Sequence, residues 1–513
     1  MGRALLLLAF VGLAAANLPR VKINPQRQFV TENGKVLLLH GTSFVRKEVD
    51  MVDVSEAVMR FISQELGFNT VRLGFEWNLL EPTPGQYNMT YLDLMEDLVN
   101  RFAKHNIYTF LDMHQDCWSP LQCGHGLPSF YAQPYDKPGY RKGEKYAFPE
   151  PIKHPKYSPN ATGKFPPISN CDEAEESFLG WAGCYPSFSL GAASQRLYDN
   201  DNSILDRFGD MWELVAKRFR NNTAVLGYEL INEPWVGDAF SNPLLFIPKH
   251  ADAVNLQKMN AYLHKRIRDI DNDSIIFFEP AGGGNMPMSV GYTEGPGGPA
   301  YNDRQVLSYH LYCPKADLTF KPKNKILQWI VKYLGPFIRD EECTAMYNSE
   351  ATARVNSGKS LGVAGLLTEF GALSGTHEGV WDAINTLQDI MDKSYTGWIY
   401  WELDNHAQSY SQVDAVTTRH LTRTYPKSVS GVPSAYAFSD ETGAFSLTYL
   451  PAKGSQQETE IYYNPRIHYP NGAVCSVSPP GAAQCRLDSA NKRVLVTHST
   501  QLESEITVSL TKA

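Results

Sequence analysis

The sequence predicts an α/β fold, a closed (β/α)8 TIM barrel, followed by a C-terminal all-β sandwich domain. Eight short apolar runs with strand-like composition alternate with helical patterns, and eight such units are the number that closes this barrel. Near the C-terminus, turn residues separate short alternating runs, which is typical of a β-sandwich. At 513 residues the chain exceeds what one hydrophobic core usually fills, so a second domain is expected.

The predicted barrel strands are, in order, 36–44, 70–77, 108–114, 225–235, 275–281, 307–312, 365–371 and 397–404. Helical spacing occurs between them at 54–66, 91–105, 206–220, 253–270 and 379–391. Strands that alternate with helices pair in parallel through right-handed crossovers. A doubly wound open sheet is the competing architecture, and it is disfavoured because no glycine-rich phosphate turn follows the first strand.

The predicted domain organisation has three parts. Residues 1–16 form a signal peptide, residues 17–415 form the catalytic barrel, and residues 416–513 form the β-sandwich. A long loop insertion at 115–202 follows the third strand and shows no clear amphipathic helix. Loops of this length are usually functional, so this one is expected over the active face of the barrel.

The first residues read as a secretory leader. Arg3 precedes an apolar run from Ala4 to Leu13, and a small-residue cleavage site follows, so the mature chain is expected to start near Asn17. The run is shorter than the roughly 20 residues that span a bilayer. We therefore expect secretion to an extracellular or digestive setting, or residence in vesicles or lysosomes.

Cysteine usage agrees with an oxidising compartment. The eight cysteines fall as near neighbours, which suggests local disulfides: 117–123, 171–184, 313–343 and 475–485. Roughly a hundred pairings are possible, and the sequence does not select one. No C-x-x-C pair or matching histidine set predicts a metal site. Glycosylation sequons begin at Asn88, Asn160, Asn221 and Asn272.

Charge and composition exclude one class of partner. The formal net charge is −8 and the isoelectric point is near 5.9, so nucleic acid is not an expected partner. We expect a monomer without cofactor or metal.

Polar residues gather where the predicted barrel strands end, and this is the end that builds the active site in such barrels. The clearest pair is Glu233, in Leu230-Ile-Asn-Glu-Pro-Trp235, and Glu369, in Leu367-Thr-Glu-Phe-Gly371. Two carboxyl groups about 5 to 5.5 Å apart cleave a glycosidic bond, one by protonating the leaving oxygen and the other by attacking the anomeric carbon. We expect Arg72 and Tyr312 to keep Glu369 ionised while Glu233 holds the proton.

These motifs, together with His310-Leu-Tyr312 and Trp401, resemble glycoside hydrolase family 5 of the clan A retaining glycosidases, over roughly residues 30 to 410. Within that family the chain is similar to the endoglycoceramidases, which cut between the oligosaccharide and the ceramide of glycosphingolipids. Asp112-Met-His-Gln-Asp-Cys-Trp118 and the tail segment Tyr425 to Gly431 carry this closer resemblance.

The resemblance implies a role for each matching residue. Glu233 would be the acid/base and Glu369 the nucleophile. The remaining expected contacts are with the sugar and with the two carboxylates, and they involve Lys47, Arg72, His114, Asp116, Asn232, His310, Tyr312 and Trp401. Asn232 would bind the sugar 2-hydroxyl, His114 and Asp116 the outer hydroxyls, and Trp401 would lie under the ring.

Several alternatives remain open at this point. Arg72 and His114 could simply satisfy core hydrogen bonds, and Trp401 could be barrel packing. A family 5 β-glycanase acting on a soluble glycan, or a glucosylceramide-type β-glucosidase, would share the same catalytic residues. A binding protein without turnover is disfavoured, because it has no need of the whole set. Glu279 and Glu402 also end strands, and they are assigned structural roles.

The lipid part of the substrate would need an apolar surface beside the sugar pocket. Candidate segments are Phe240 to Ile247 and Ile326 to Ile338. The helical spacing of the second segment is equally typical of core packing. Transient contact with a membrane or micelle surface is expected on this reading.

Overall fold

Eight parallel strands close into a barrel in the order β10-β11-β4-β5-β6-β7-β8-β9. The structure is a computed structural model, and it describes residues 18–45, 47, 54–133, 185, 187–247, 249–284, 289–313, 340–371, 378–403, 415–454, 458–499 and 502–513. The barrel strands are β4 His40–Val45, β5 Thr70–Phe75, β6 Tyr108–Met113, β7 Val225–Glu229, β8 Ile275–Phe278, β9 Gln305–His310, β10 Ala364–Gly371 and β11 Gly397–Trp401. The predicted barrel is confirmed.

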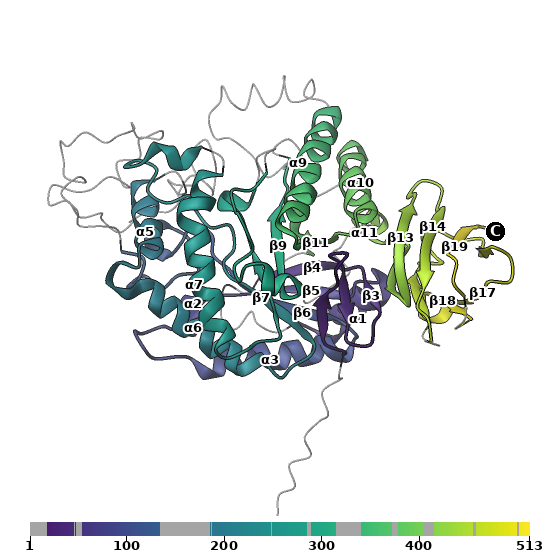
Figure 1. Cartoon of the computed structure of the whole chain (residues 1–513), viewed down its shortest axis with the longest axis horizontal. Coiled ribbons are helices and arrows are strands. Elements are labelled where there is room, and N and C mark those ends of the chain that lie inside the picture. Colours follow the sequence, from purple (N-terminus) through teal and green to yellow (C-terminus); the bar gives the residue numbers. More distant parts are fainter. Residues whose placement is uncertain are drawn as a thin grey trace, which may run out of the picture.

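Helices lie around the outside of the barrel (Figure 1). They are α1 Glu56–Arg60, α2 Trp77–Leu80, α3 Met89–Lys104, α5 Phe188–Tyr198, α6 Ile204–Phe219, α7 Gln257–Arg268, α9 Asp340–Leu361, α10 Glu378–Lys393 and α11 Ala415–Leu421. Single π-helical turns extend α1 at Phe61–Glu65 and precede α7 at Asp252–Leu256. The five predicted helices are all present within a few residues.

Four of the described helices were not predicted: the short helices α2 and α11, and the longer helices α5 and α9. α5 lies inside the 115–202 segment, which was expected to lack a helix, and α9 follows β9. Much of the buried side of α9 consists of small or polar residues: Glu350, Ala351, Arg354 and Ser357. α5 buries alanine and serine beside two leucines. Helices with such faces give little hydrophobic periodicity.

Several predicted strands are shorter than expected, and two of them differ most. The run 36–44 divides, because Val36–Leu37 (β3) pairs in another sheet and the barrel strand begins at His40. The run 225–235 forms a strand only to Glu229. Asn232 and Glu233 therefore lie in the turn that follows β7.

The C-terminal strands form two antiparallel sheets. One is seven-stranded, in the order β1-β2-β3-β12-β15-β18-β17, and the other is four-stranded, β13-β14-β19-β16. Their bounds are β1 Val21–Ile23, β2 Phe29–Thr31, β12 Tyr425–Val429, β13 Gly431–Phe438, β14 Phe445–Pro451, β15 Thr459–Tyr462, β16 Ala473–Ser478, β17 Ala483–Asp488, β18 Arg493–His498 and β19 Ile506–Lys512. The predicted C-terminal β domain is confirmed.

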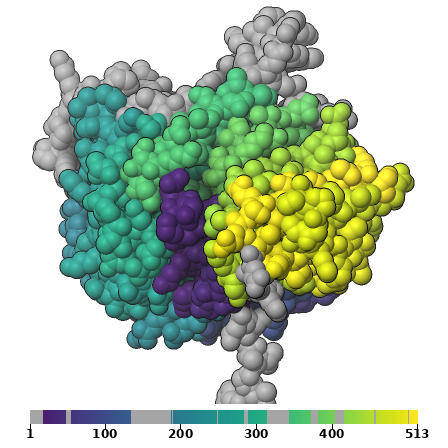
Figure 2. Space-filling model, turned by 45° about the vertical axis from the view of Figure 1, so that its right-hand side comes forward, coloured from purple at the N-terminus to yellow at the C-terminus, as the bar shows by residue number. Residues whose placement is uncertain are grey.

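The N-terminal strands belong to this C-terminal sheet, although the sequence placed all residues from 17 to 415 in the barrel. β3 pairs with β12, and Figure 2 shows the N-terminal segment (purple) against the C-terminal strands (yellow and light green). Val21, Ile23 and Phe29 form one apolar cluster with Phe110 and Phe277 of the barrel strands. Alternation along β1 and β2 thus turns their apolar side chains toward the barrel.

The C-terminal sheets contact the barrel at the N-terminal ends of its strands. The His40 ring lies between Trp398 and Tyr425, with centroids 4.0 and 3.9 Å away. His40 Nε2 lies 2.9 Å from Oδ1 of Asp392. The Tyr425 hydroxyl donates to the carbonyl of Gly67, just before β5. These contacts stabilise the fold at one end of the barrel and leave the carboxyl ends of the strands for the site.

Two of the suggested disulfides are confirmed. Cys313 is bonded to Cys343, and Cys475 to Cys485, which links β16 and β17 across the two C-terminal sheets. Cys117 and Cys123 are also disulfide-bonded. Cys171 and Cys184 lie outside the described residues, so the other two pairings stay predictions. In the part of the chain that the structure describes, no helix is long and apolar enough to cross a bilayer.

The close packing of Gly67 against the ring of Tyr462 can be tested by comparison with Gly85, a glycine of similar backbone conformation. Gly67 has φ +74°, and a Cβ there would lie 2.4 Å from the ring of Tyr462, whereas Gly85 has φ +73° and open space. Both alanine variants bear a left-handed backbone cost of about 1–2 kcal/mol. Gly67→Ala must also displace Tyr462, so its free energy of unfolding, measured by urea denaturation, should fall further than that of Gly85→Ala by about 1–3 kcal/mol. Equal losses would refute the contact.

Candidate active site

Arg72 on β5 occupies the centre of the site. Along β5, Val71, Leu73 and Phe75 join the apolar core outside the barrel, so alternation turns Arg72 inward. Its side chain is fully buried and contacts groups from several strands. Nε donates to Glu229 at 2.5 Å, Nη1 to Glu369 at 2.5 Å and Nη2 to the side-chain oxygen of Asn232 at 2.8 Å. Nη2 also lies 3.1 Å from Asp112 and 3.5 Å from Glu279.

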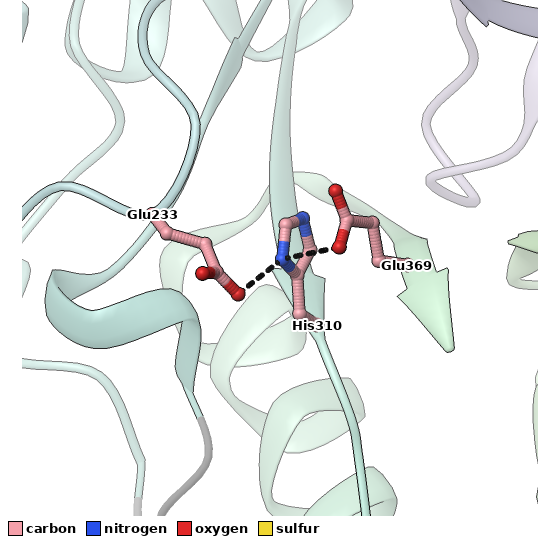
Figure 3. A group of neighbouring side chains, drawn as sticks. All are labelled: Glu233, His310 and Glu369. Carbon is pink, nitrogen blue, oxygen red and sulfur yellow. Dashed lines mark hydrogen bonds and ion pairs between the residues drawn. The ribbon is translucent and has the colours of Figure 1, made fainter. Parts of the chain in front are cut away.

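Glu233 and Glu369 face each other across His310 (Figure 3). His310 Nδ1 lies 2.8 Å from Oε1 of Glu233 and 3.3 Å from Oε2 of Glu369. One oxygen of each carboxyl group lies within 4.8 Å of the other. The Tyr312 hydroxyl donates to Oε2 of Glu369 at 2.8 Å. This spacing is close to that of retaining glycosidases and well below the roughly 6.5–9.5 Å of inverting enzymes.

Glu233 has an unusual backbone conformation. Its φ is +41°, in a region that costs a non-glycine residue about 1–2 kcal/mol. The Gln115 side-chain amide donates to the carbonyls of Asn232 and Glu233 at 2.8 and 3.0 Å, and the Asn232 amide donates to the Gln115 carbonyl at 2.9 Å. These bonds fix the turn after β7. Among the described residues, one N–H of the Asn232 amide has no partner, and it can bind a ligand.

A second group of side chains lies beside the first. Asp116 Oδ2 is 3.2 Å from Lys47 Nζ and 3.5 Å from His114 Nε2. His114 Nδ1 is 2.7 Å from Asp112, which contacts Arg72. The Trp401 ring stacks on His114 with centroids 5.5 Å apart and planes 9° apart. Hydrogen-bonding groups thus lie against an aromatic face, the combination that binds sugars.

All ten residues predicted for the site lie in this one network at the carboxyl ends of the strands. It contains Glu233 and Glu369 with Lys47, Arg72, His114, Asp116, Asn232, His310, Tyr312 and Trp401. Asp404, the last residue of the predicted eighth strand, lies outside the described residues.

Several residues of the site were missed in the sequence. His125 lies 2.9 Å from both Asp116 and Glu76, and its ring stacks on His114 at 5.8 Å. It follows a turn that contains Cys117 and Cys123, and no sequence pattern marks it. Glu229 was missed because it lies within an apolar run. It is two residues after Gly227, so both face the same side of β7. Reading alternate positions of β7 would have placed its carboxylate inside the barrel.

Burial and charge set the protonation of the central pair. Burial raises the pKa of Glu369, while His310 and Arg72 oppose that rise and Glu233 adds to it. The expectation that Arg72 and Tyr312 simply keep Glu369 ionised therefore left out its burial. Burial would lower the pKa of His310, but Glu279, Glu369 and Glu233 outweigh it and hold the pKa well above the usual value. His310 Nδ1 is therefore well placed to donate a hydrogen bond to Glu233.

The second group shows the same balance. Burial would lower the pKa of His114, but Asp112 and Asp116 raise it to about 10. Burial would raise the pKa of Asp116, but His114, His125 and Lys47 hold it well below its usual value. At neutral pH this end of the site presents a fixed carboxylate surrounded by cations.

The central trio also has the atoms that could hold a cation. Glu233, His310 and Glu369 form a group of possible ligands. A metal needs a neutral imidazole, whereas the neighbouring carboxyl groups raise the pKa of His310, and Arg72 Nη1 already lies 2.5 Å from Glu369. The donor set therefore suits proton transfer better than metal binding.

Comparisons with known proteins agree with this geometry. The family model "Cellulase (glycosyl hydrolase family 5)" matches residues 30–149 and 180–407, and the family 5 C-terminal domain model matches residues 423–510. The chain is 31% identical to an endoglycoceramidase of Cyanea nozakii, covering 95% of this chain and 92% of that protein. It is also 31% identical to an endoglycoceramidase of Hydra vulgaris, covering 90% and 83%.

A solved structure shares the fold. Endo-glycoceramidase II from Rhodococcus sp., in complex with ganglioside GM3, superposes with a TM-score of 0.69 at 21% identity, covering 94% of this chain and 99% of that one. The family model, the two relatives and the paired carboxylates at the strand ends lead to one conclusion: the chain belongs to glycoside hydrolase family 5.

Proposed function

We propose that the chain is a retaining endoglycosidase that hydrolyses the β-glycosidic bond between the oligosaccharide and the ceramide of glycosphingolipids. The observation that carries this proposal is the Glu233 and Glu369 pair, with oxygens within 4.8 Å of each other and held by Arg72 and His310. The curated relatives that match nearly the whole chain are endoglycoceramidases, and this supports the substrate class.

In the first step Glu369 attacks the anomeric carbon while Glu233 gives its proton to the ceramide oxygen. The carbon–oxygen bond to ceramide breaks and a glycosyl–enzyme ester forms. Glu369 accepts a hydrogen bond from Arg72 at Oε1 and one from Tyr312 at Oε2, and these fix the orientation of the carboxylate. In the second step water attacks the ester and returns its proton to Glu233.

The sugar next to the scissile bond would lie between the carboxylates and Trp401. The free N–H of Asn232 is placed for its 2-hydroxyl, where contacts strengthen in the transition state. Asp116, with Lys47 and His114 beside it, would accept hydrogen bonds from the outer hydroxyls. His125 holds Asp116 from the other side and belongs to the same subsite.

A soluble β-glucan and a glycosphingolipid can be distinguished directly. Incubation with ganglioside, lactosylceramide, glucosylceramide and soluble β-glucan should release ceramide and intact oligosaccharide from the lipids that carry longer glycans. Glu369→Gln should lower this hydrolysis by at least about 10³-fold while the dissociation constant for the lipid changes little. Glu350→Gln, which alters a buried carboxyl of α9 outside the site, is the control. Sugar released from the glucan alone, or substantial turnover by Glu369→Gln, would contradict the proposal.

We also propose that an exposed apolar patch beside the site contacts the lipid surface. Of the candidate segment 240–247, Phe240 and Leu245 are buried, whereas Leu244, Phe246 and Ile247 are 53%, 39% and 53% exposed. Phe246 packs edge-on against Trp235, two residues after Glu233. Trp235 thus connects the patch to the acid/base residue Glu233. The other candidate segment, 326–338, lies outside the described residues.

Removing two apolar side chains should weaken the membrane contact. Leu244→Ser with Ile247→Ser should lower binding to ganglioside-containing vesicles about tenfold, because each side chain loses part of its burial in lipid. Hydrolysis of a soluble aryl lactoside should be unaffected. The control pair is Leu450→Ser with Val474→Ser, which are 41% and 51% exposed on the C-terminal sheets. Equal vesicle binding by both double variants would show that the patch is not the contact.

Secretion is proposed on the leader pattern and on the two described disulfides, which persist in oxidising compartments. Asn221 and Asn272 are exposed and can accept glycans, whereas the Asn88 side chain caps α3.

Protein recovered from the culture medium should begin near Asn17 by N-terminal sequencing. Retention of Met1 in the recovered protein would contradict cleavage.

A further inference from the structure

Glu279 is a buried carboxyl group that the proposed reaction does not use. It follows β8, and it is only 2% exposed. Its Oε2 accepts a hydrogen bond from the backbone N–H of Glu233 at 3.3 Å. Its Oε1 lies 3.4 Å from Nε2 of His310 and 3.5 Å from Nη2 of Arg72. The side chain therefore contacts the acid/base residue both directly and through the imidazole.

His310 lies between two carboxyl groups. Nε2 faces Glu279, and Nδ1 faces Oε1 of Glu233 at 2.8 Å. A change of charge at Glu279 is thus felt at the N–H that the ring presents to Glu233. The same carboxyl helps to hold Glu233 in its positive-φ conformation, whose cost only a rigid surrounding can sustain.

The charged groups around Glu279 come from three other strands. They are Arg72 of β5, Glu229 of β7 and His310 of β9. Burial raises the pKa of Glu279 to about 8, with His310 and Arg72 opposing the rise and Glu229 adding to it. Glu279 therefore gains its negative charge as the pH rises through about 8, and that charge in turn raises the pKa of His310.

We propose that Glu279 is a positioning residue for proton donation by Glu233. It fixes the backbone of the acid/base residue and, through its contact with His310, controls the hydrogen bond that His310 Nδ1 donates to Glu233. The inference rests on the proposed role of Glu233. The proton that leaves Glu233 goes to the ceramide oxygen, and water later restores it. Glu279 gains and loses no proton over a complete turnover.

Glu279→Gln keeps the shape and an acceptor for the Glu233 N–H, but it removes the negative charge that Glu279 gains as the pH rises through about 8. Without that charge the pKa of His310 falls, so the imidazolium is lost at lower pH. The basic limb of the kcat/KM profile on a glycosphingolipid should move down by about one pH unit. kcat should fall on this substrate, which needs protonation of its leaving oxygen. On an aryl lactoside with an acidic phenol, kcat should stay near the wild-type value.

The matched control is Glu350→Gln, since burial also raises the pKa of Glu350 to about 7. This control should leave the pH profile unchanged. Glu279→Asp keeps the charge on a shorter side chain, so it should restore the position of the limb while kcat stays low. If Glu279→Gln does not fold, the aspartate variant still tests the idea, because a shifted limb there would overturn it. An unshifted limb in Glu279→Gln, or equal losses on both substrates, would also overturn it.

Failure of the underlying assignment would look different. Glu233→Gln should lose most activity on the glycosphingolipid and much less on the aryl lactoside, because the acidic phenol leaves without protonation. Equal losses on the two substrates in that variant would remove the acid/base role itself, whatever Glu279 does.

Discussion

One buried guanidinium determines the arrangement of this site. Arg72 is fully buried, and its three nitrogens contact groups that follow or end four other strands. Burial would lower the pKa of Arg72, but its four carboxylate neighbours raise it well above the usual value. A buried cation is tolerated only with such partners. The carboxylates depend on Arg72 in turn, because without its positive charge they would repel one another at this end of the barrel.

The two reactive carboxyl groups have different partners. Glu369 contacts Arg72 and Tyr312, whereas Glu233 contacts the imidazole of His310. The guanidinium and the hydroxyl orient the carboxylate that attacks, and the ring holds the proton donor beside it. Glu233 also has a strained, positive φ. Two hydrogen bonds hold this conformation: its carbonyl accepts one from Gln115, and its N–H donates one to Glu279. The opposite end of the barrel carries the contacts that stabilise the fold, through His40 and the C-terminal sheets.

Much of this could be predicted from the sequence, for physical reasons. Buried parallel strands are continuous apolar runs, so the eight barrel strands and the polar residues at their ends were found. Helix α9 was missed because its buried face includes Glu350, Arg354 and Ser357. β1 to β3 were misplaced because sheet pairing over some 400 residues leaves no local signal. His125 lies beside Asp116 only after the turn between them is folded. The pKa of Glu369 is raised because the side chain is buried, and no sequence motif reveals that burial.

The central claim is that Glu369 forms the bond to the sugar. A 2-deoxy-2-fluoro-lactosyl fluoride should react once and accumulate as an ester. The anomeric fluoride leaves readily when the ester forms, whereas the 2-fluorine slows the hydrolysis of the ester. Mass spectrometry of the digested protein should then place the lactosyl mass on the peptide that contains Glu369. A label on Glu233, Glu279 or any other carboxylate would contradict the account.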